Sequence, residues 1–150
     1  MKLFRAMEEI KGIPPTAVAL GNFDGVHRGH AELIARIVRL ARERGLKSAV
    51  FTFSNHPQNV ITGRNVVRHI VSPEEKIEII RSMDVDFLFS APFDALFRSM
   101  SPEAFTRDLL VDRLNAAAVG CGFNYRFGKD AAGTTVCLEE AAEREGFRVE

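Results

Sequence analysis

Apolar and polar positions along the chain alternate between two periods, one typical of buried strands and one typical of amphipathic helices. A nearly continuous apolar run over 17–21 predicts a first strand, and such a run favours burial on both faces, as in a parallel sheet. From about Gly29 to Arg44 the apolar residues recur at helical spacing, with arginines on the opposite side. Gly45 then predicts the end of this helix. The apolar stripe consists of Leu33, Ile34, Ile37, Val38 and Ala41.

The same alternation continues to the end of the sequence. Further strands are predicted over 47–53, 85–89 and 116–121, with one more beginning at 147–150. Further helices are predicted from Ser72, from Ser101 to about Leu114, and from about Thr135 to Glu145. The first two begin with Ser-Pro, in which serine can cap the first turn and proline suits its first position. The connection over 54–71 has mixed signals, and its length is typical of a functional loop.

Strands that alternate with helices predict an α/β fold, namely a Rossmann-like parallel sheet with helices on both faces. Ligands on such sheets bind beyond the carboxyl ends of the strands. The segments 22–29, 54–60 and 122–133 each follow a predicted strand, so we expect them to converge on one crevice. A length of 150 residues fits one domain. Because the sequence ends as a strand begins, we expect it to be part of a longer domain.

Composition narrows the class of protein. Hydrophobic residues make up 46% of the chain, which is enough for a core. Lys+Arg and Asp+Glu are both 20, so the net charge is zero and gives no support for a nucleic-acid partner. Cys121 and Cys137 are expected to be free thiols in a reducing compartment. With neither a signal sequence nor an apolar run of about 18 residues, we expect a cytoplasmic protein without a membrane partner.

The segment from Gly21 to His30 carries the strongest chemical signal, with three glycines and two histidines in ten residues. Glycines admit unusual backbone angles and close approach of a ligand, and successive amides in such a turn can bind an anion. The helix that follows adds the positive end of its dipole. His27 and His30 lie three residues apart, so both can donate to phosphate oxygens. The glycine patterns of nicotinamide-binding enzymes and of P-loop kinases are absent from the sequence, which argues against both classes.

The His-x-Gly-His spacing resembles that of the nucleotidyltransferase superfamily. The full string from Gly21 to His30 is similar to one branch of it, the FAD synthetase (FMN adenylyltransferase) module of the bacterial bifunctional riboflavin kinase/FAD synthetase family. The segments 51–57, 101–105 and 122–128, with Gly133 after the last, resemble further motifs of that family in the same order.

Two features depart from the family pattern. Ser54-Asn55 stand where the family often has an acidic residue. The family's later Ser-Ser-Thr-x-x-Arg segment and its kinase signature do not occur in these 150 residues. We therefore expect 1–150 to be an FMN adenylyltransferase domain that lacks its C-terminal part. The riboflavin kinase domain is absent from this sequence and is expected to be covalently linked in the parent protein.

The resemblance implies transfer of AMP from ATP to FMN, giving FAD and pyrophosphate. Mg²⁺ would bridge phosphate oxygens, without dedicated protein ligands. The implied catalytic residues are His27 and His30. The implied ATP-binding residues are Gly21, Asn22, Phe23, Gly25, Gly29 and Arg126. The implied flavin-binding residues are Phe53, His56, Pro57 and Asn124.

Simpler interpretations stay open for several of these residues. Phe53 can be a packing residue, His56-Pro57 a surface turn, Asn124 a turn residue and Arg126 a solvated side chain. Two other functions also stay open. One is another adenylyl- or cytidylyltransferase of the same superfamily, acting on a pantetheine phosphate, a mononucleotide or an alcohol phosphate. The other is a nucleotide-binding module without turnover.

Overall fold

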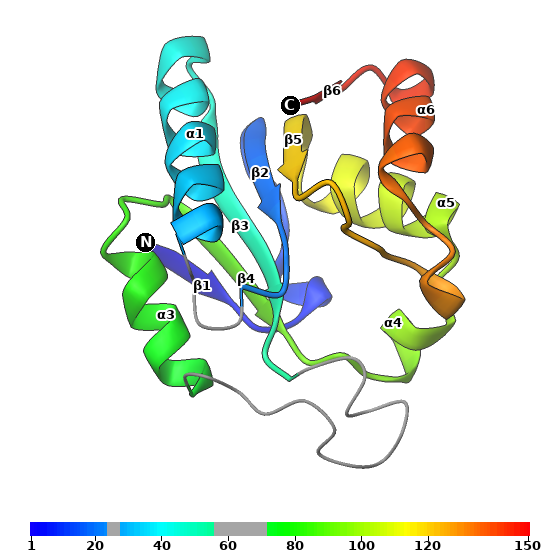
Figure 1. Cartoon of the computed structure of the whole chain (residues 1–150), viewed down its shortest axis with the longest axis horizontal. Helices are drawn as coiled ribbons and strands as arrows, with labels where there is room; N and C mark the ends of the chain where they lie inside the picture. The colour runs from blue at the N-terminus through cyan, green and yellow to red at the C-terminus, as the bar shows by residue number, and fades with distance from the viewer. Residues whose placement is uncertain (24–27, 56–71) are drawn as a thin grey trace.

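One six-stranded sheet organises the part of the chain that the computed structural model describes, residues 1–23, 28–55 and 72–150 (Figure 1). All of its strand pairs are parallel, in the order β1-β4-β3-β2-β5-β6. The strands are β1 (Lys2–Phe4), β2 (Thr16–Leu20), β3 (Lys47–Phe53), β4 (Phe87–Ala91), β5 (Ala116–Cys121) and β6 (Arg148–Val149). The helices are η1 (Met7–Glu9), α1 (Arg28–Arg44), α3 (Pro73–Arg81), α4 (Ala95–Ser99), α5 (Pro102–Ala104), η2 (Phe105–Arg113), η3 (Lys129–Ala131) and α6 (Thr135–Glu145). The predicted α/β class with a parallel sheet is confirmed.

Helices cover both faces of the sheet, as predicted. Figure 1 shows α1 and α3 on one side and α4, α5 and α6 on the other. The core on the α1 side includes the buried Ile34 and Ile37 of α1 together with Ile77 and Ile80 of α3. The opposite core is larger and is rich in phenylalanine and leucine. The sheet therefore lies between two apolar layers, which agrees with the complete burial of every residue of β2.

Two strands differ from the prediction. β4 begins at Phe87, two residues later than expected, and the residue before it, Asp86, contacts the start of β3 with its side chain. Its carboxylate accepts from the Ser48 amide at 2.9 Å and the Ser48 hydroxyl at 3.2 Å. β1 was not predicted, since three residues are too few to show a period. It pairs with β4 at the sheet edge, where Phe4 stacks on Phe89 with ring centroids 5.0 Å apart.

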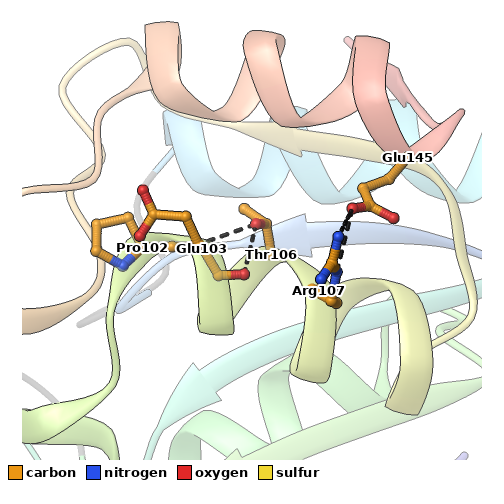
Figure 2. Close-up of polar contacts among 5 residues, drawn as sticks. All are labelled: Pro102, Glu103, Thr106, Arg107 and Glu145. Atoms are coloured by element: carbon orange, nitrogen blue, oxygen red, sulfur yellow. Dashed lines mark hydrogen bonds and ion pairs between the residues drawn. The ribbon is translucent and has the colours of Figure 1, made fainter.

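The helix predicted from Ser101 changes its winding after one turn. The Ser101 hydroxyl accepts from the Ala104 amide at 3.1 Å and so caps α5 as expected. The chain then continues as the π-helix η2, which ends with the Leu114 amide donating to the Leu109 carbonyl at 2.8 Å. The Thr106 hydroxyl lies at the transition and donates to the carbonyls of Pro102 and Glu103 at 3.2 and 3.0 Å, as Figure 2 shows. A hydroxyl that competes for these carbonyls favours a local change of winding.

The helices α1 and α6 end where glycine was predicted to stop them. Gly45 has φ +67° and Gly146 has φ +83°, both in the left-handed region that favours glycine. On the outer surface, Arg107 of η2 donates to Glu145 near the end of α6 at 3.2 Å (Figure 2). A surface ion pair of this kind contributes about 1 kcal/mol or less, so the apolar core rather than this pair holds α6 in place.

The order of the strands places a crevice beside β2. From β2 the chain moves through β3 to β4 in one direction, and it then returns to place β5 on the other side of β2. The helices that follow β2 and β5 lie on opposite faces of the sheet. The chain therefore leaves the carboxyl ends of these two neighbouring strands in opposite directions. Such a reversal of strand order is the place where open α/β sheets bind their ligands.

The larger core generates a stability prediction. Leu109 of η2 is fully buried (0% exposed), whereas Leu96 of α4 is 53% exposed. We expect Leu109→Ala to lower the free energy of unfolding by about 2–5 kcal/mol, because it removes buried methyl groups and leaves a cavity. The matched control Leu96→Ala should change it by about 0.5 kcal/mol or less. Urea denaturation measures both values, and equal losses in the two variants would contradict this account of the core.

Candidate active site

A cleft of about 710 Å³ lies at the predicted place, beyond the carboxyl ends of β2 and β5. Its walls are residues 20–23 after β2, the first turns of α1, and residues 121–126 after β5. Two of the three segments predicted to converge there, 22–29 and 122–133, contribute described residues to the lining. For the third, 54–60, only Ser54 and Asn55 are described, and neither lines the cleft.

The first wall is built around a buried phenylalanine. Phe23 is 0% exposed and has φ +50°, an angle that side chains other than glycine rarely adopt. A Cβ atom on Gly21 would lie 2.8 to 3.1 Å from three atoms of the Phe23 ring. Gly21 is therefore needed for the close approach of that ring. The positive φ therefore falls on Phe23 and not on Gly21, while Gly29 lies in the first turn of α1.

His30 is the described member of the predicted catalytic pair. It lies in the first turn of α1, is half-buried and lines the cleft. Its ring meets the Phe23 ring edge to face, with centroids 5.2 Å apart and an interplanar angle of 86°. The packing of Phe23 against Gly21 thus also orients the imidazole at the cleft. His27 and Gly25, also assigned from the sequence, lie outside the described residues.

The opposite wall is a turn that follows β5. The Tyr125 amide donates to the Gly122 carbonyl at 3.1 Å, and the exposed Asn124 lies within this turn and lines the cleft. Both interpretations of Asn124, as a turn residue and as a substrate contact, are compatible with that position. Arg126 also lines the cleft and donates to the Ala131 carbonyl at 3.4 Å. Phe123 is 91% exposed at the same wall, and its side chain was not singled out from the sequence.

Close backbone pairing holds this turn in shape. Phe127 and Gly133 exchange amide-to-carbonyl hydrogen bonds of 3.1 and 2.7 Å. A Cβ atom on Gly133 would lie 2.5 Å from the Phe127 ring, and Gly128 has φ +78°. Gly128 and Gly133 are therefore favoured for steric reasons, which explains why a glycine at 133 accompanies the motif over 122–128.

Of the residues assigned to the flavin, Asn124 lines the cleft, whereas Phe53 does not. Phe53 packs among Phe51, Phe93 and Phe97 on the opposite face of the sheet, with ring centroids 5.2 to 5.3 Å away. Asn55 stands where the family often has an acidic residue, and its side-chain oxygen accepts from the Phe93 amide at 2.6 Å. His56 and Pro57 lie outside the described residues, so the flavin side stays a prediction.

Several lining residues were missed by the sequence reasoning. Arg36 projects from the polar side of α1 into the cleft, and Cys121 lies at the end of β5. Arg36 was treated as one of the arginines opposite the apolar stripe. It lies four residues after Glu32, which also lines the cleft, so both project from the same side of α1. Lys76 of α3 was also missed, although it shares a helix face with the buried Ile80. Only the structure shows that this lysine is itself buried, with 5% of its surface exposed.

Burial determines the protonation of two groups in the cleft. Desolvation, with a smaller contribution from the charge of Glu139, raises the pKa of the Cys121 thiol. Desolvation also raises the pKa of the Tyr125 phenol well above its usual range, helped by the nearby Cys121. Both groups therefore stay protonated and neutral near neutral pH. Neither adds negative charge to a cleft that contains Arg36 and Arg126.

Within residues 1–23, 28–55 and 72–150, no three His, Cys, Asp or Glu side chains are grouped so that they could hold a metal ion. In the same ranges, none of the helices combines the length and the apolar character needed to cross a membrane.

Comparisons with known proteins point to one family. The family model described as FAD synthetase matches residues 10–150. A bifunctional riboflavin kinase/FMN adenylyltransferase from Listeria monocytogenes is 36% identical over 127 residues, covering 84% of this chain and 40% of the relative. The Haemophilus influenzae protein of the same name is 30% identical over 151 residues, covering 100% of this chain and 49% of the relative. The chain thus spans about half the length of the curated relatives that it matches.

A solved structure shows the same fold. It is described as a macrolide-efflux protein from Streptococcus pneumoniae, and it superimposes with a TM-score of 0.83 at 25% sequence identity. The match covers 99% of this chain and 49% of that protein. The Rossmann-like α/β fold is therefore shared over nearly all of this chain.

The two cysteines provide a test of the cleft. Hydrogen bonds from Thr134 lower the pKa of Cys137, whereas burial raises the pKa of Cys121. A lower pKa gives more thiolate at a given pH. We therefore expect iodoacetamide at mildly alkaline pH to modify Cys137 faster than Cys121, as followed by peptide mass spectrometry. ATP should slow the modification of Cys121 alone, because Cys121 lines the cleft. Unchanged modification of Cys121 in the presence of ATP would contradict binding of ATP beside it.

Proposed function

This chain belongs to the FAD synthetase family, and from that premise we propose that the protein transfers AMP from MgATP to FMN, giving FAD and pyrophosphate. The observation that carries the proposal is the position of His30. It lies at the first turn of α1, in a cleft between the carboxyl ends of β2 and β5. Backbone amides and the helix dipole at such a place favour a phosphate.

The charges of the described lining support an anionic ligand. Arg36 and Arg126 face the cleft, and Glu32 carries the one carboxylate among its described lining residues. Glu32 forms an ion pair with Arg28 at 3.5 Å, which offsets part of its negative charge. The lining thus carries more positive than negative charge, and a nucleotide triphosphate complements it.

The proposed reaction needs positioning more than proton transfer. An oxygen of the FMN phosphate attacks the α-phosphorus of ATP, a new P–O–P bond forms, and the bond to the β-phosphate oxygen breaks to release pyrophosphate. The attacking phosphate is already an anion at neutral pH, so a strong general base is not required. His27 and His30 would donate hydrogen bonds to the transferring and leaving phosphates, where negative charge develops.

The donor set of the cleft fits a weakly held Mg²⁺. With a single carboxylate in the described lining, the ion would be held chiefly by phosphate oxygens and water, as Mg²⁺ commonly is. When bound it neutralises phosphate charge. The residues of this chain would hold the phosphates around it, through the amides of the loop after β2 and through Arg126.

The flavin side and the partners complete the proposal. Asn124, His56 and Pro57 are proposed to lie on the side of FMN, whereas the contacts of Phe53 favour its alternative role as a packing residue. A riboflavin kinase domain on the same polypeptide is proposed from the names of the curated relatives, which are bifunctional. A cytoplasmic location stays part of the proposal, because the substrates are cytoplasmic metabolites.

An acceptor-specificity assay tests this function. We expect pyrophosphate release from ATP and Mg²⁺ to require FMN, and not to occur with pantetheine phosphate, nicotinamide mononucleotide or glycerol phosphate. The assay uses the protein as the cell makes it, with ATP alone as the blank. Release with a rival phosphate and none with FMN would support another nucleotidyltransferase of the superfamily. ATP binding without release for any acceptor would support a binding module without turnover.

The histidine pair provides a second test. We expect the double variant His27→Ala/His30→Ala to lose about 100-fold or more in kcat, because it removes donors that stabilise charge in the transition state. Its circular dichroism spectrum should remain that of the unmodified protein. His69→Ala is the matched control, since His69 lies outside the loop between β2 and α1 and should leave kcat unchanged. A double variant with undiminished kcat would remove both histidines from the mechanism.

A further inference from the structure

A lysine lies buried behind the loop that leads from β2 to α1. Lys76 of α3 is 5% exposed. Contacts of its ammonium include the Phe53 carbonyl at 2.9 Å, the Asn22 carbonyl at 3.0 Å and the Thr52 hydroxyl at 3.3 Å. Lys76 therefore links the carboxyl end of β3 to the carboxyl end of β2, and the latter forms a wall of the cleft. A buried amine is tolerated only when its donors are satisfied, so these contacts hold the side chain in one position.

The Asn22 carbonyl accepts two hydrogen bonds. Besides the Lys76 ammonium, the Thr52 hydroxyl donates to it at 2.9 Å. Thr52 is itself buried in β3. Two donors on one carbonyl oxygen determine the orientation of the peptide plane between Asn22 and Phe23. This plane precedes a residue with φ +50°, an angle that persists only where the surroundings enforce it.

The orientation of this peptide has a consequence for the cleft. Every described peptide bond is trans, so the Phe23 N–H points opposite to the Asn22 carbonyl. The carbonyl points to Lys76, behind the loop, and the N–H therefore points away from Lys76. Asn22 and Phe23 both line the cleft. An ammonium on the carbonyl oxygen also polarises the amide, which makes its N–H a stronger donor.

We propose that Lys76 is a positioning residue that aims and polarises the Asn22–Phe23 peptide, so that its N–H donates to a phosphate oxygen of the nucleotide. Lys76 acts from behind the loop, through the peptide, and does not touch the nucleotide. The inference rests on the proposed function in one respect, the binding of a nucleotide phosphate in this cleft. It is independent of the acceptor that receives the AMP.

The test compares two ligands that differ only in phosphate. Calorimetric titration measures the affinities of the protein for ATP with Mg²⁺ and for adenosine. The ratio of the two affinities reports the phosphate contacts. We expect Lys76→Met to lower this ratio about tenfold, the size of one charge-assisted hydrogen bond, while the affinity for adenosine stays the same. General loosening of the cleft would weaken both ligands together and leave the ratio unchanged, and that result would overturn the proposal.

Two further variants keep the test decisive. Lys11→Met is the matched control, because Lys11 is exposed and precedes the amino end of β2, whereas Asn22 follows its carboxyl end, and it should leave the ratio unchanged. Thr52→Val removes the second donor to the Asn22 carbonyl with little change in volume. It should lower the ratio about fivefold, as expected for a neutral hydrogen bond. If Lys76→Met does not fold, as judged by thermal melting, Thr52→Val decides alone, and an unchanged ratio in it would overturn the proposal.

FMN is absent from this titration, which separates the two proposals. A protein that prefers ATP to adenosine, and loses that preference in Lys76→Met, supports the role of Lys76 whichever acceptor is used. Failure of FMN-dependent pyrophosphate release in the unmodified protein would then overturn the proposed function alone. An unmodified protein that binds ATP no better than adenosine would overturn the role of Lys76.

Discussion

The parallel pairing of β2 with β3 on one side and with β5 on the other is the constraint on which the rest of this structure depends. Both partners align with β2 in the same direction, from Thr16 to Leu20. All three strands therefore end at one edge of the sheet, and the segments that follow them begin there. Since the chain reverses its lateral direction at β2, the cleft opens between β2 and β5. The chemistry of the site follows from which residues stand at these strand ends.

The wall formed after β2 shows how the fold holds an unfavourable backbone angle in place. The buried Phe23 ring lies against Gly21 in front and meets His30 at its edge. The Asn22 carbonyl is held from behind by the α3 lysine and by Thr52. Strain of this kind costs about 1–3 kcal/mol and is retained where surrounding contacts over-determine the conformation. The packing that tolerates the strain is the same packing that directs an imidazole toward the cleft.

Most of the architecture could be predicted because it is encoded in short-range patterns. The limits of β3 and β5, the caps at Ser72 and Ser101, and the stop at Gly146 each depend on a few neighbouring residues. Prediction failed where distant contacts decide. β1 is only three residues long and exists because β4 is available to pair with it. The π-helical winding of η2 was missed for a different reason, since it accompanies local hydrogen bonds of Thr106 that helical periodicity does not reveal.

The features of the candidate site also fall into two groups, those that the sequence predicts and those that only the structure reveals. The sequence by itself determined the α/β class, the glycine- and histidine-rich segment after β2, and the family that these motifs resemble, because such signals are local and ordered along the chain. Only the tertiary structure decided that β5 lies beside β2, that Phe53 packs away from the cleft, and that a left-handed angle falls on Phe23 rather than on Gly21. It alone also placed Lys76 beneath Asn22, 54 residues away in the sequence. Contacts between residues so far apart in the sequence are determined by strand order and by the packing of helices on the sheet. Neither can be predicted from the periodicity of a single segment.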